Sequence, residues 1–246
     1  MRELEIIRDV RTNIVLFRED HITVLLGKTL LSTCAMFIAA HVAVLPFSDA
    51  SHGSIQQKLW SNLRLDSDTS FTEIFGHGLS FSAALLFYIA FLAGGTRALL
   101  VVAAFATFVW FDDSSSYHER AGSLLANHFE WDPLFGVPAS DLGQIVAWLL
   151  VAIIVVPAAI LYLRRPTPHD RAAALICLVP ALLIGTCGIL LDFLHSATSG
   201  SLADVLTVLE DGGELMGLAI LAVLSIAFMR QAVASPDRSV PPADPV

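Results

Sequence analysis

Long apolar runs alternate with short polar segments along most of the chain. Each long run has about 18 or more residues, which is enough for a helix to cross roughly 30 Å of hydrocarbon. The runs are continuously apolar and lack the residue-by-residue alternation of a membrane β-strand. The pattern therefore predicts an all-α fold, a polytopic membrane helical bundle with six transmembrane helices. We expect the spans at about residues 22–47, 71–93, 96–117, 144–163, 172–195 and 203–229.

The polar segments outside these runs differ in what they predict. Four arginines lie among apolar residues at roughly helical spacing in residues 1–20. This spacing indicates an amphipathic helix on the membrane surface, with an irregular polar terminus as the alternative. Residues 55–63 have the pattern of a short surface helix, and residues 121–143 are expected to form a loop. Residues 1–234 are expected to be one domain, followed by a proline-rich, disordered cytoplasmic tail at 235–246.

Composition supports the membrane class and excludes several others. The chain is 55% hydrophobic and 15% charged, with a mean hydropathy of +0.70, whereas soluble domains contain about 25% charged residues. The net charge of −9 lacks the basic patch of a protein that binds nucleic acid. The three cysteines, Cys34, Cys177 and Cys187, lie inside apolar runs and form no CxxC motif, so neither a disulfide framework nor a thiolate zinc site is expected.

Lysine and arginine are distributed unequally between the two sides of a six-span bundle. The side that holds both termini carries 11 of the 14 Lys and Arg residues, whereas the other side carries only Lys58, Arg64 and Arg120. Positively charged segments remain on the cytoplasmic side. We therefore expect both termini to be cytoplasmic and the protein to be a multi-pass protein of the cell membrane.

Acidic residues and histidines have the opposite bias. The outer half carries 15 of the 23 Asp and Glu residues and six of the eight His residues. Loop acidity accounts for some of this excess, but part of it lies inside the predicted spans. Ionisable residues at such a depth are costly and indicate a functional site.

Successive spans run in opposite directions, which brings ionisable residues of several spans to the same outer depth. Three pairs also share a helical face, because their members are three or four residues apart. These pairs are Glu73 with His77, Asp192 with His195, and Glu210 with Glu214. The sequence therefore predicts that the pairs form separate walls of one polar site.

The third span ends in the polar stretch 110–119, which forms a further wall. If the helix is continuous, Asp112 and Glu119 lie on one face, and Asp113 lies about 100° away from Asp112. We expect Asp113, His118 and Glu119 to point into the site and Asp112 to support them.

Gathered carboxylates repel one another in a low dielectric, so either some are protonated or a cation lies among them. Mixed imidazole and carboxylate ligands suit zinc or iron. Both one zinc ion with an open position and a two-metal site of the kind found in helical bundles fit the residues. The predicted ligands of one or two divalent ions are His77, Asp113, His118, Asp192, His195 and Glu210.

The resulting hypothesis is a metal-dependent membrane enzyme with its site near the outer leaflet. A metal-bound water is the expected nucleophile, with Glu119 or Glu214 as the general base of a hydrolase that acts on a lipid or lipid-linked substrate. A di-iron-type oxidase is the parallel option. The alternative class is a cation or proton transporter, or a metal-sensing or assembly protein without catalysis. Membrane lipid is the expected partner, and nucleic acid is not.

Overall fold

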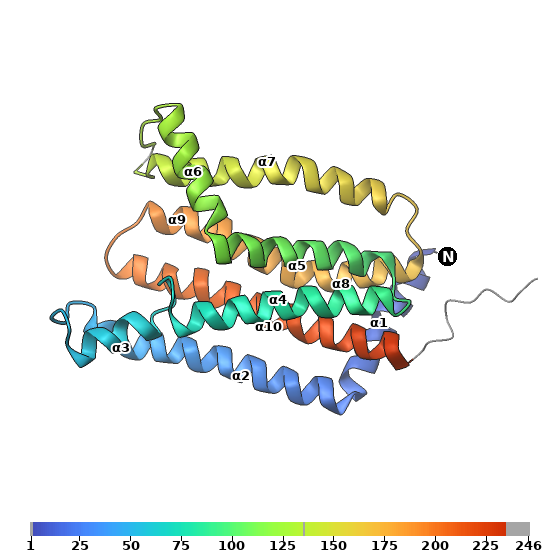
Figure 1. Ribbon diagram of the computed structural model, residues 1–246. Coiled ribbons are helices and arrows are strands. Elements are labelled where there is room, and N and C mark those ends of the chain that lie inside the picture. The colour runs from blue at the N-terminus through green and yellow to red at the C-terminus, as the bar shows by residue number, and fades with distance from the viewer. Residues whose placement is uncertain (1, 135, 235–246) are drawn as a thin grey trace, which may run out of the picture.

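A computed structural model describes residues 2–134 and 136–234, and the regular elements in these ranges are helices (Figure 1). In chain order they are α1 (Arg2–Glu19), α2 (His21–Val44), the 3₁₀ turn η1 (Leu45–Phe47), α3 (Ile55–Leu63), α4 (Phe71–Leu92), α5 (Arg97–Ser115), α6 (Tyr117–His128), α7 (Ala139–Tyr162), α8 (Pro168–Gly185), the π-helical turn η2 (Thr186–Leu191), α9 (Asp192–Ser196) and α10 (Ser201–Ala234). The tail predicted to be disordered, 235–246, lies outside the described residues.

Within the described residues, six helical segments are long and apolar enough to cross a membrane, which confirms the six predicted spans by length and composition. They are His21–Phe47, Phe71–Leu92, Arg97–Ser115, Ala139–Tyr162, Pro168–Ser196 and Ser201–Ala234. The predicted short helix at 55–63 is also present as α3.

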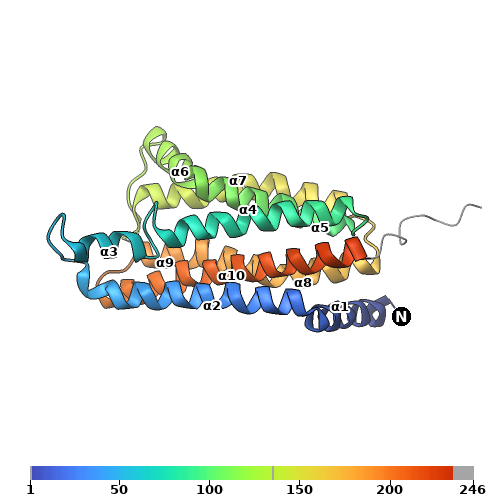
Figure 2. The ribbon, with the colours of Figure 1, turned by 60° about the horizontal axis from the view of Figure 1, so that its bottom comes forward.

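Helix α10 lies in the middle of the bundle and packs against α2, α4 and α8 (Figures 1 and 2). Its buried Leu215, Leu218 and Leu221 belong to the same apolar core as Phe87 of α4. Small residues let the helices approach closely, as is typical of membrane bundles. A β-carbon on Gly217 would lie only 2.7 Å from Cγ1 of Ile184. The core therefore holds α10 and α8 in a fixed register.

Helix α1 runs across one end of the bundle, from the start of α2 to the start of α8 (Figure 1). Asp20 joins α2 to the end of α10, since Nε and Nη2 of Arg230 donate to its two carboxylate oxygens at 2.6 and 2.9 Å. The residue also caps α2 by accepting from Thr23 N. Of the two predictions for residues 1–20, the helix is the one observed.

The third span does not continue to Tyr117, so the expected continuous helix through Glu119 is wrong. The chain leaves α5 at Ser116, whose φ of 47° and ψ of 44° are left-handed, and starts again as α6. The turn is stabilised because Oδ1 of Asp112 accepts the backbone N–H of His118 at 3.0 Å. As a result, Asp112 and Glu119 lie on different helices. The predicted loop at 121–143 is also partly wrong, because α6 extends to His128.

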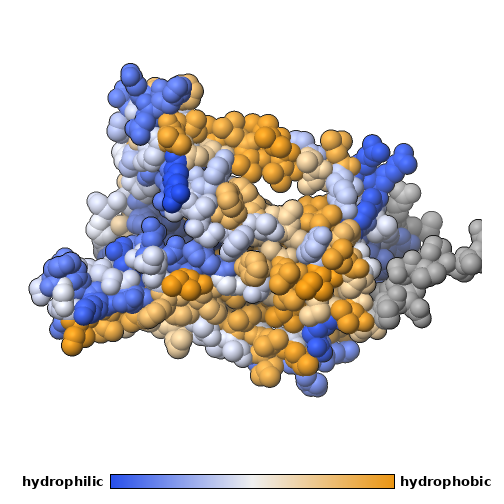
Figure 3. Space-filling view, in the orientation of Figure 1, coloured by the Kyte–Doolittle hydropathy of each residue, from blue (hydrophilic) through white to orange (hydrophobic). Residues whose placement is uncertain are grey.

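Helix α7 packs almost entirely against α6, and the rest of it stands apart from the bundle. The two helices touch where a β-carbon on Gly143 would overlap the backbone of Gly122. Beyond this contact, Figure 3 shows an opening between the apolar surface of α7 and the remaining helices. Ile153 and Ile154 of α7 are 68% and 72% exposed.

Candidate functional site

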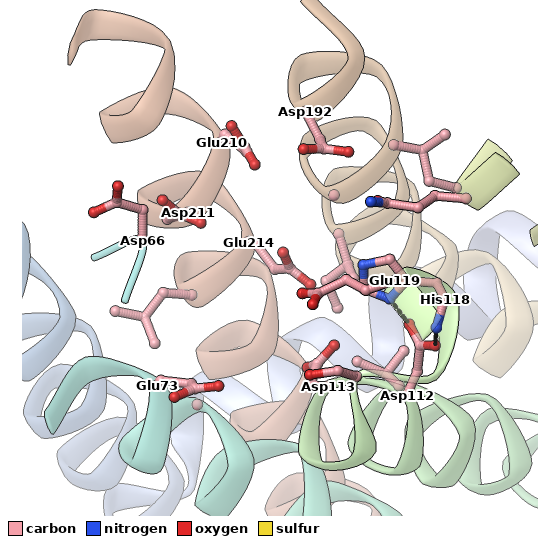
Figure 4. A pocket seen from close by; sticks show the side chains of 18 of the residues that line it. Asp66, Glu73, Asp112, Asp113, His118, Glu119, Asp192, Glu210, Asp211 and Glu214 are labelled. Carbon is pink, nitrogen blue, oxygen red and sulfur yellow. Dashed lines mark hydrogen bonds and ion pairs between the residues drawn. The ribbon is translucent and has the colours of Figure 1, made fainter. Parts of the chain in front are cut away.

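A cavity of about 650 Å³ lies toward the end of the bundle that carries α3 and α6. Its wall contains ten carboxylic residues: Asp66, Asp68, Glu73, Asp112, Asp113, Glu119, Asp192, Glu210, Asp211 and Glu214. Three histidines, His77, His118 and His195, complete the ionisable lining. Among the described residues, the lining includes no lysine or arginine. Figure 4 shows the carboxylates of α4, α5, α9 and α10 around one central space.

The inner end of the cavity is apolar. Besides the acids, the lining of the cavity includes Phe105, Ile184 and Leu218. Because a helix rises 1.5 Å per residue, Phe105 lies about 10 Å farther along α5 than Asp112. The lining therefore changes from charged to apolar within about two helical turns.

His118 is held in place by Asp112. The carboxylate of Asp112 is fully buried, and its Oδ2 lies 2.8 Å from Nδ1 of His118. Burial disfavours the imidazolium, but the hydrogen bond to Asp112 and its charge outweigh burial and raise the pKa of His118. A carboxylate on one ring nitrogen is the arrangement that orients metal-binding histidines and leaves the other nitrogen for the ion.

His195 differs because both of its ring nitrogens have partners. Nδ1 lies 2.8 Å from Oε2 of Glu210, and Nε2 lies 3.3 Å from Oγ1 of Thr207. The hydroxyl of Thr207 also donates to the carbonyl of Ala203 at 3.1 Å. His195 therefore joins α9 to α10, and it would need to release Thr207 in order to bind an ion.

His77 lies on the opposite wall, on α4. Its Nε2 is 3.7 Å from Oε1 of Glu73, which is beyond hydrogen-bond distance. The same atom is buried and has no hydrogen-bond partner among the described residues. An unpartnered buried nitrogen on a cavity wall is available to a ligand.

Glu214 lies at the centre of the acidic wall (Figure 4). A β-carbon on Gly188 would lie 3.2 Å from its Oε2, so the glycine of the π-helical turn makes room for the carboxylate. Such turns are frequent at functional sites. No hydrogen bond joins the Glu214 carboxylate to another group within the described ranges, and Oδ2 of the neighbouring Asp211 is buried without a partner. These groups lack the internal partners that buried carboxylates normally have.

Glu119 reaches the cavity from α6 rather than from the third span. Burial raises the pKa of its carboxyl, and the charges of Asp68, Asp112 and Asp192 add to this effect while His118 opposes it. A raised pKa makes this carboxylate a stronger proton acceptor than an ordinary surface glutamate.

The structure places all eight predicted site residues on the wall of this cavity: His77, Asp113, His118, Glu119, Asp192, His195, Glu210 and Glu214. Their roles as ligands or bases stay predictions. In the ranges 2–134 and 136–234, no three His, Cys, Asp or Glu side chains are already arranged to hold one metal ion.

The prediction did not include Asp66, Asp68 or Asp211, which also line the cavity. Asp66 and Asp68 lie in the loop before α4, where sequence pattern gives no direction to a side chain. Asp66 is anchored by Arg64, whose guanidinium donates to both carboxylate oxygens. Burial raises the pKa of the Asp66 carboxyl, but the pairing with Arg64 opposes burial. The net effect is a lowered pKa. His41 of α2 is buried but does not line the cavity, and its Nδ1 accepts from Leu65 N at 3.0 Å.

Comparison with known proteins identifies the family. The model of the family described as "Domain of unknown function (DUF8692)" matches residues 29–228, which include all six spans in whole or in large part. The chain therefore belongs to this family. No curated protein and no solved structure matches the chain.

Proposed function

We propose that this member of the DUF8692 family binds a divalent metal ion in the acidic cavity and uses it to hydrolyse a lipid or lipid-linked substrate. One observation carries the proposal: ten carboxylic side chains and three imidazoles share a cavity that has no lysine or arginine in its described lining. Charges of one sign repel strongly in a low dielectric. A divalent cation reduces this repulsion, and its ligands are already on the wall.

The best-placed ligands are His118, Glu214 and Asp113. His118 is oriented by Asp112, and its Nδ1 is the nitrogen engaged by that carboxylate. The carboxylates of Asp113 and Glu214 approach the same region from α5 and α10 (Figure 4). Because these three groups do not yet surround one point, ion binding requires rotation of their side chains. Imidazole with carboxylate suits zinc or iron, and zinc is the ion that supports hydrolysis without redox chemistry.

Glu119 is the proposed general base. A divalent ion supplies an activated water when it is bound, and a carboxylate must then accept the proton. Glu119 lies beside His118 on α6, and its raised pKa suits proton transfer. Glu214 was the other candidate base, but its central position makes it a better ligand.

The apolar part of the cavity supports a lipid or lipid-linked substrate. Trp148 of α7 lines the cavity, and the centre of its ring lies 5.1 Å from that of Phe108 of α5, so α7 adds aromatic surface to the lining. Phe105 and Ile184 continue the apolar lining inward. A head group among the acids and an acyl chain along these apolar residues match the polarity of the cavity. The same apolar inner end disfavours ion transport, which needs a polar route to the other side.

The metal content of the purified protein tests the proposal. Wild type in detergent is expected to retain about one or two ions of zinc or iron, as suits a structural or catalytic site. His118→Ala and Glu214→Gln are expected to lose them, whereas Asp49→Asn, in an exposed loop outside the cavity, retains them. Wild type that binds neither zinc nor iron when either ion is added would overturn the proposal.

Hydrolysis is tested separately from binding. Lipids of several head-group classes are incubated with the metal-loaded protein, and products are followed by mass spectrometry. Glu119→Gln is expected to keep its metal and lose at least about 100-fold in kcat, the typical contribution of a general base. Equal rates for this variant and wild type would remove Glu119 from the mechanism.

We also propose that the cavity faces the outside of the cell. The inner ends of the spans carry most of the lysine and arginine. A membrane-impermeant maleimide is expected to label Asp132→Cys in intact cells and to leave Arg165→Cys unlabelled. The three native cysteines are buried and give little background. The reverse labelling pattern would contradict this orientation.

A further inference from the structure

A second cavity, of about 460 Å³, lies at the opposite end of the bundle, where the α7–α8 loop meets α1. Its lining consists of Glu5, Ile6, Arg164, Arg165, Pro166, Pro168 and Arg171. Three guanidinium groups therefore share one small cavity with a single carboxylate. The lining of this second cavity is therefore positively charged, opposite in sign to the lining of the acidic cavity.

Two other acids of this end, Asp170 and Asp9, are already engaged. Asp170 is buried, accepts from Ala98 N at 3.2 Å and caps α8 through Thr167. Asp9 lies 3.2 Å from Nδ1 of His169. Across the described part of the chain, no ion pair or side-chain hydrogen bond involves the guanidinium groups lining the cavity. Their charge is therefore available to a ligand.

The loop that carries two of these arginines is stiff. Pro166 and Pro168 restrict the backbone on either side of the capping residue Thr167. Nη2 of Arg97 also donates to the carbonyl of Arg165 at 2.5 Å. A loop fixed in this way loses little entropy when an anion binds.

Exposed apolar side chains lie close in sequence to the residues that line this cavity. Leu4 and Ile7, which neighbour the lining residues of α1, are 71% and 64% exposed. Leu161, at the end of α7, is 65% exposed. Exposed apolar groups beside arginines are the pattern of a segment that lies at the head-group level of a bilayer.

We propose that this cavity binds the phosphate group of an anionic phospholipid in the leaflet on the side of the termini. Arg164, Arg165 and Arg171 donate to the phosphate oxygens, for which the planar guanidinium has matching geometry. The acyl chains lie along the apolar surface of α1. Basic cavities between membrane helices bind anionic head groups in this way. The inference does not depend on the acidic cavity or its chemistry.

Thermal unfolding in an uncharged detergent tests this site. The probes are phosphatidylglycerol, phosphatidylcholine and inorganic phosphate at equal concentration. Phosphatidylglycerol is expected to raise the Tm of wild type, because a ligand that binds only the folded state stabilises it. Phosphatidylcholine and inorganic phosphate are expected to leave the Tm unchanged at that concentration. Added salt should reduce the effect of phosphatidylglycerol.

Matched variants assign the effect to the cavity. The Arg164→Gln/Arg171→Gln double variant is expected to bind phosphatidylglycerol at least tenfold more weakly, since two charge-assisted contacts are removed. Arg120→Gln, on α6 at the other end of the bundle, keeps the wild-type response. An equal response to inorganic phosphate and phosphatidylglycerol would overturn the lipid assignment in favour of free phosphate. A double variant that folds and responds like wild type would overturn the site itself.

Discussion

Nδ1 of His118 lies 2.8 Å from Oδ2 of Asp112, across the break that separates α5 from α6. The other oxygen of Asp112 accepts the backbone N–H of His118. One fully buried carboxylate thus closes the helix break and orients the imidazole toward the acidic cavity. The local fold and the proposed metal site depend on the same side chain.

Replacement of Asp112 by Asn is expected to weaken zinc binding about 10- to 100-fold, the usual effect of removing a carboxylate that orients a metal-binding histidine. The amide is similar in size but cannot fix the same tautomer of His118. Competition with a chromophoric chelator measures the affinity, and Asp49→Asn is the control. Unchanged zinc affinity in a folded Asp112→Asn protein would show that His118 is not a ligand.

The same pair predicts how the stability of the metal-free protein depends on pH. The pKa of His118 is raised above its usual value of 6.5 in the folded protein, where burial opposes protonation and Asp112 outweighs it. The folded state therefore binds the proton more tightly than the unfolded state does. The stabilisation is fully present below about pH 6.5 and is lost as the pH rises through the raised pKa.

Unfolding in the presence of a chelator at several pH values from 6 to 9 checks this dependence. Wild type is expected to lose stability relative to Asp112→Asn as the pH rises, since only wild type contains the His118–Asp112 pair. A constant difference in Tm between the two proteins over this range would contradict the raised pKa.

Two glycines of the same wall provide a matched pair of substitutions. A β-carbon on Gly188 would lie 3.2 Å from Oε2 and 3.4 Å from Oε1 of Glu214, whereas one on Gly185 would meet no atom within 4 Å. Gly188→Ala is expected to displace the carboxylate and weaken metal binding about tenfold, similar to other changes next to metal ligands. Gly185→Ala is expected to keep the affinity and to gain up to about 1 kcal/mol of helix stability. Equal metal affinity in the two variants would mean that the position of Glu214 does not matter.

Asp170 is expected to be important for stability at the opposite end. Its carboxylate accepts from Ala98 N, and from the backbone and hydroxyl of Thr167. Asp170→Ala leaves these donors without a partner, and the expected cost is about 1–3 kcal/mol in the free energy of unfolding. Asp9→Ala, which removes a contact to the exposed His169, is expected to cost less than about 1 kcal/mol. Denaturation by sodium dodecyl sulfate compares both with wild type, and equal losses would contradict the capping role.

Much of the candidate site could be predicted because helix geometry and alternating direction do not depend on packing detail. Glu210 and Glu214 share a face of α10 by their spacing alone, and both line the cavity. Asp66 and Asp68 could not be predicted, since a loop has no periodicity. The pairing of His195 with Glu210 joins two helices, so spacing within one helix did not indicate it.

The sequence by itself determined the six apolar helices and the shared end of the bundle at which their ionisable residues gather, because hydrocarbon thickness requires about 20 apolar residues in each span. Only the tertiary structure decided the break at Ser116, the π-helical turn and the partner of each histidine. A single residue in the left-handed region changes the direction of a helix, and its cost is offset by contacts such as that between Asp112 and His118. These contacts join residues on different helices, so they exist only once the helices have packed.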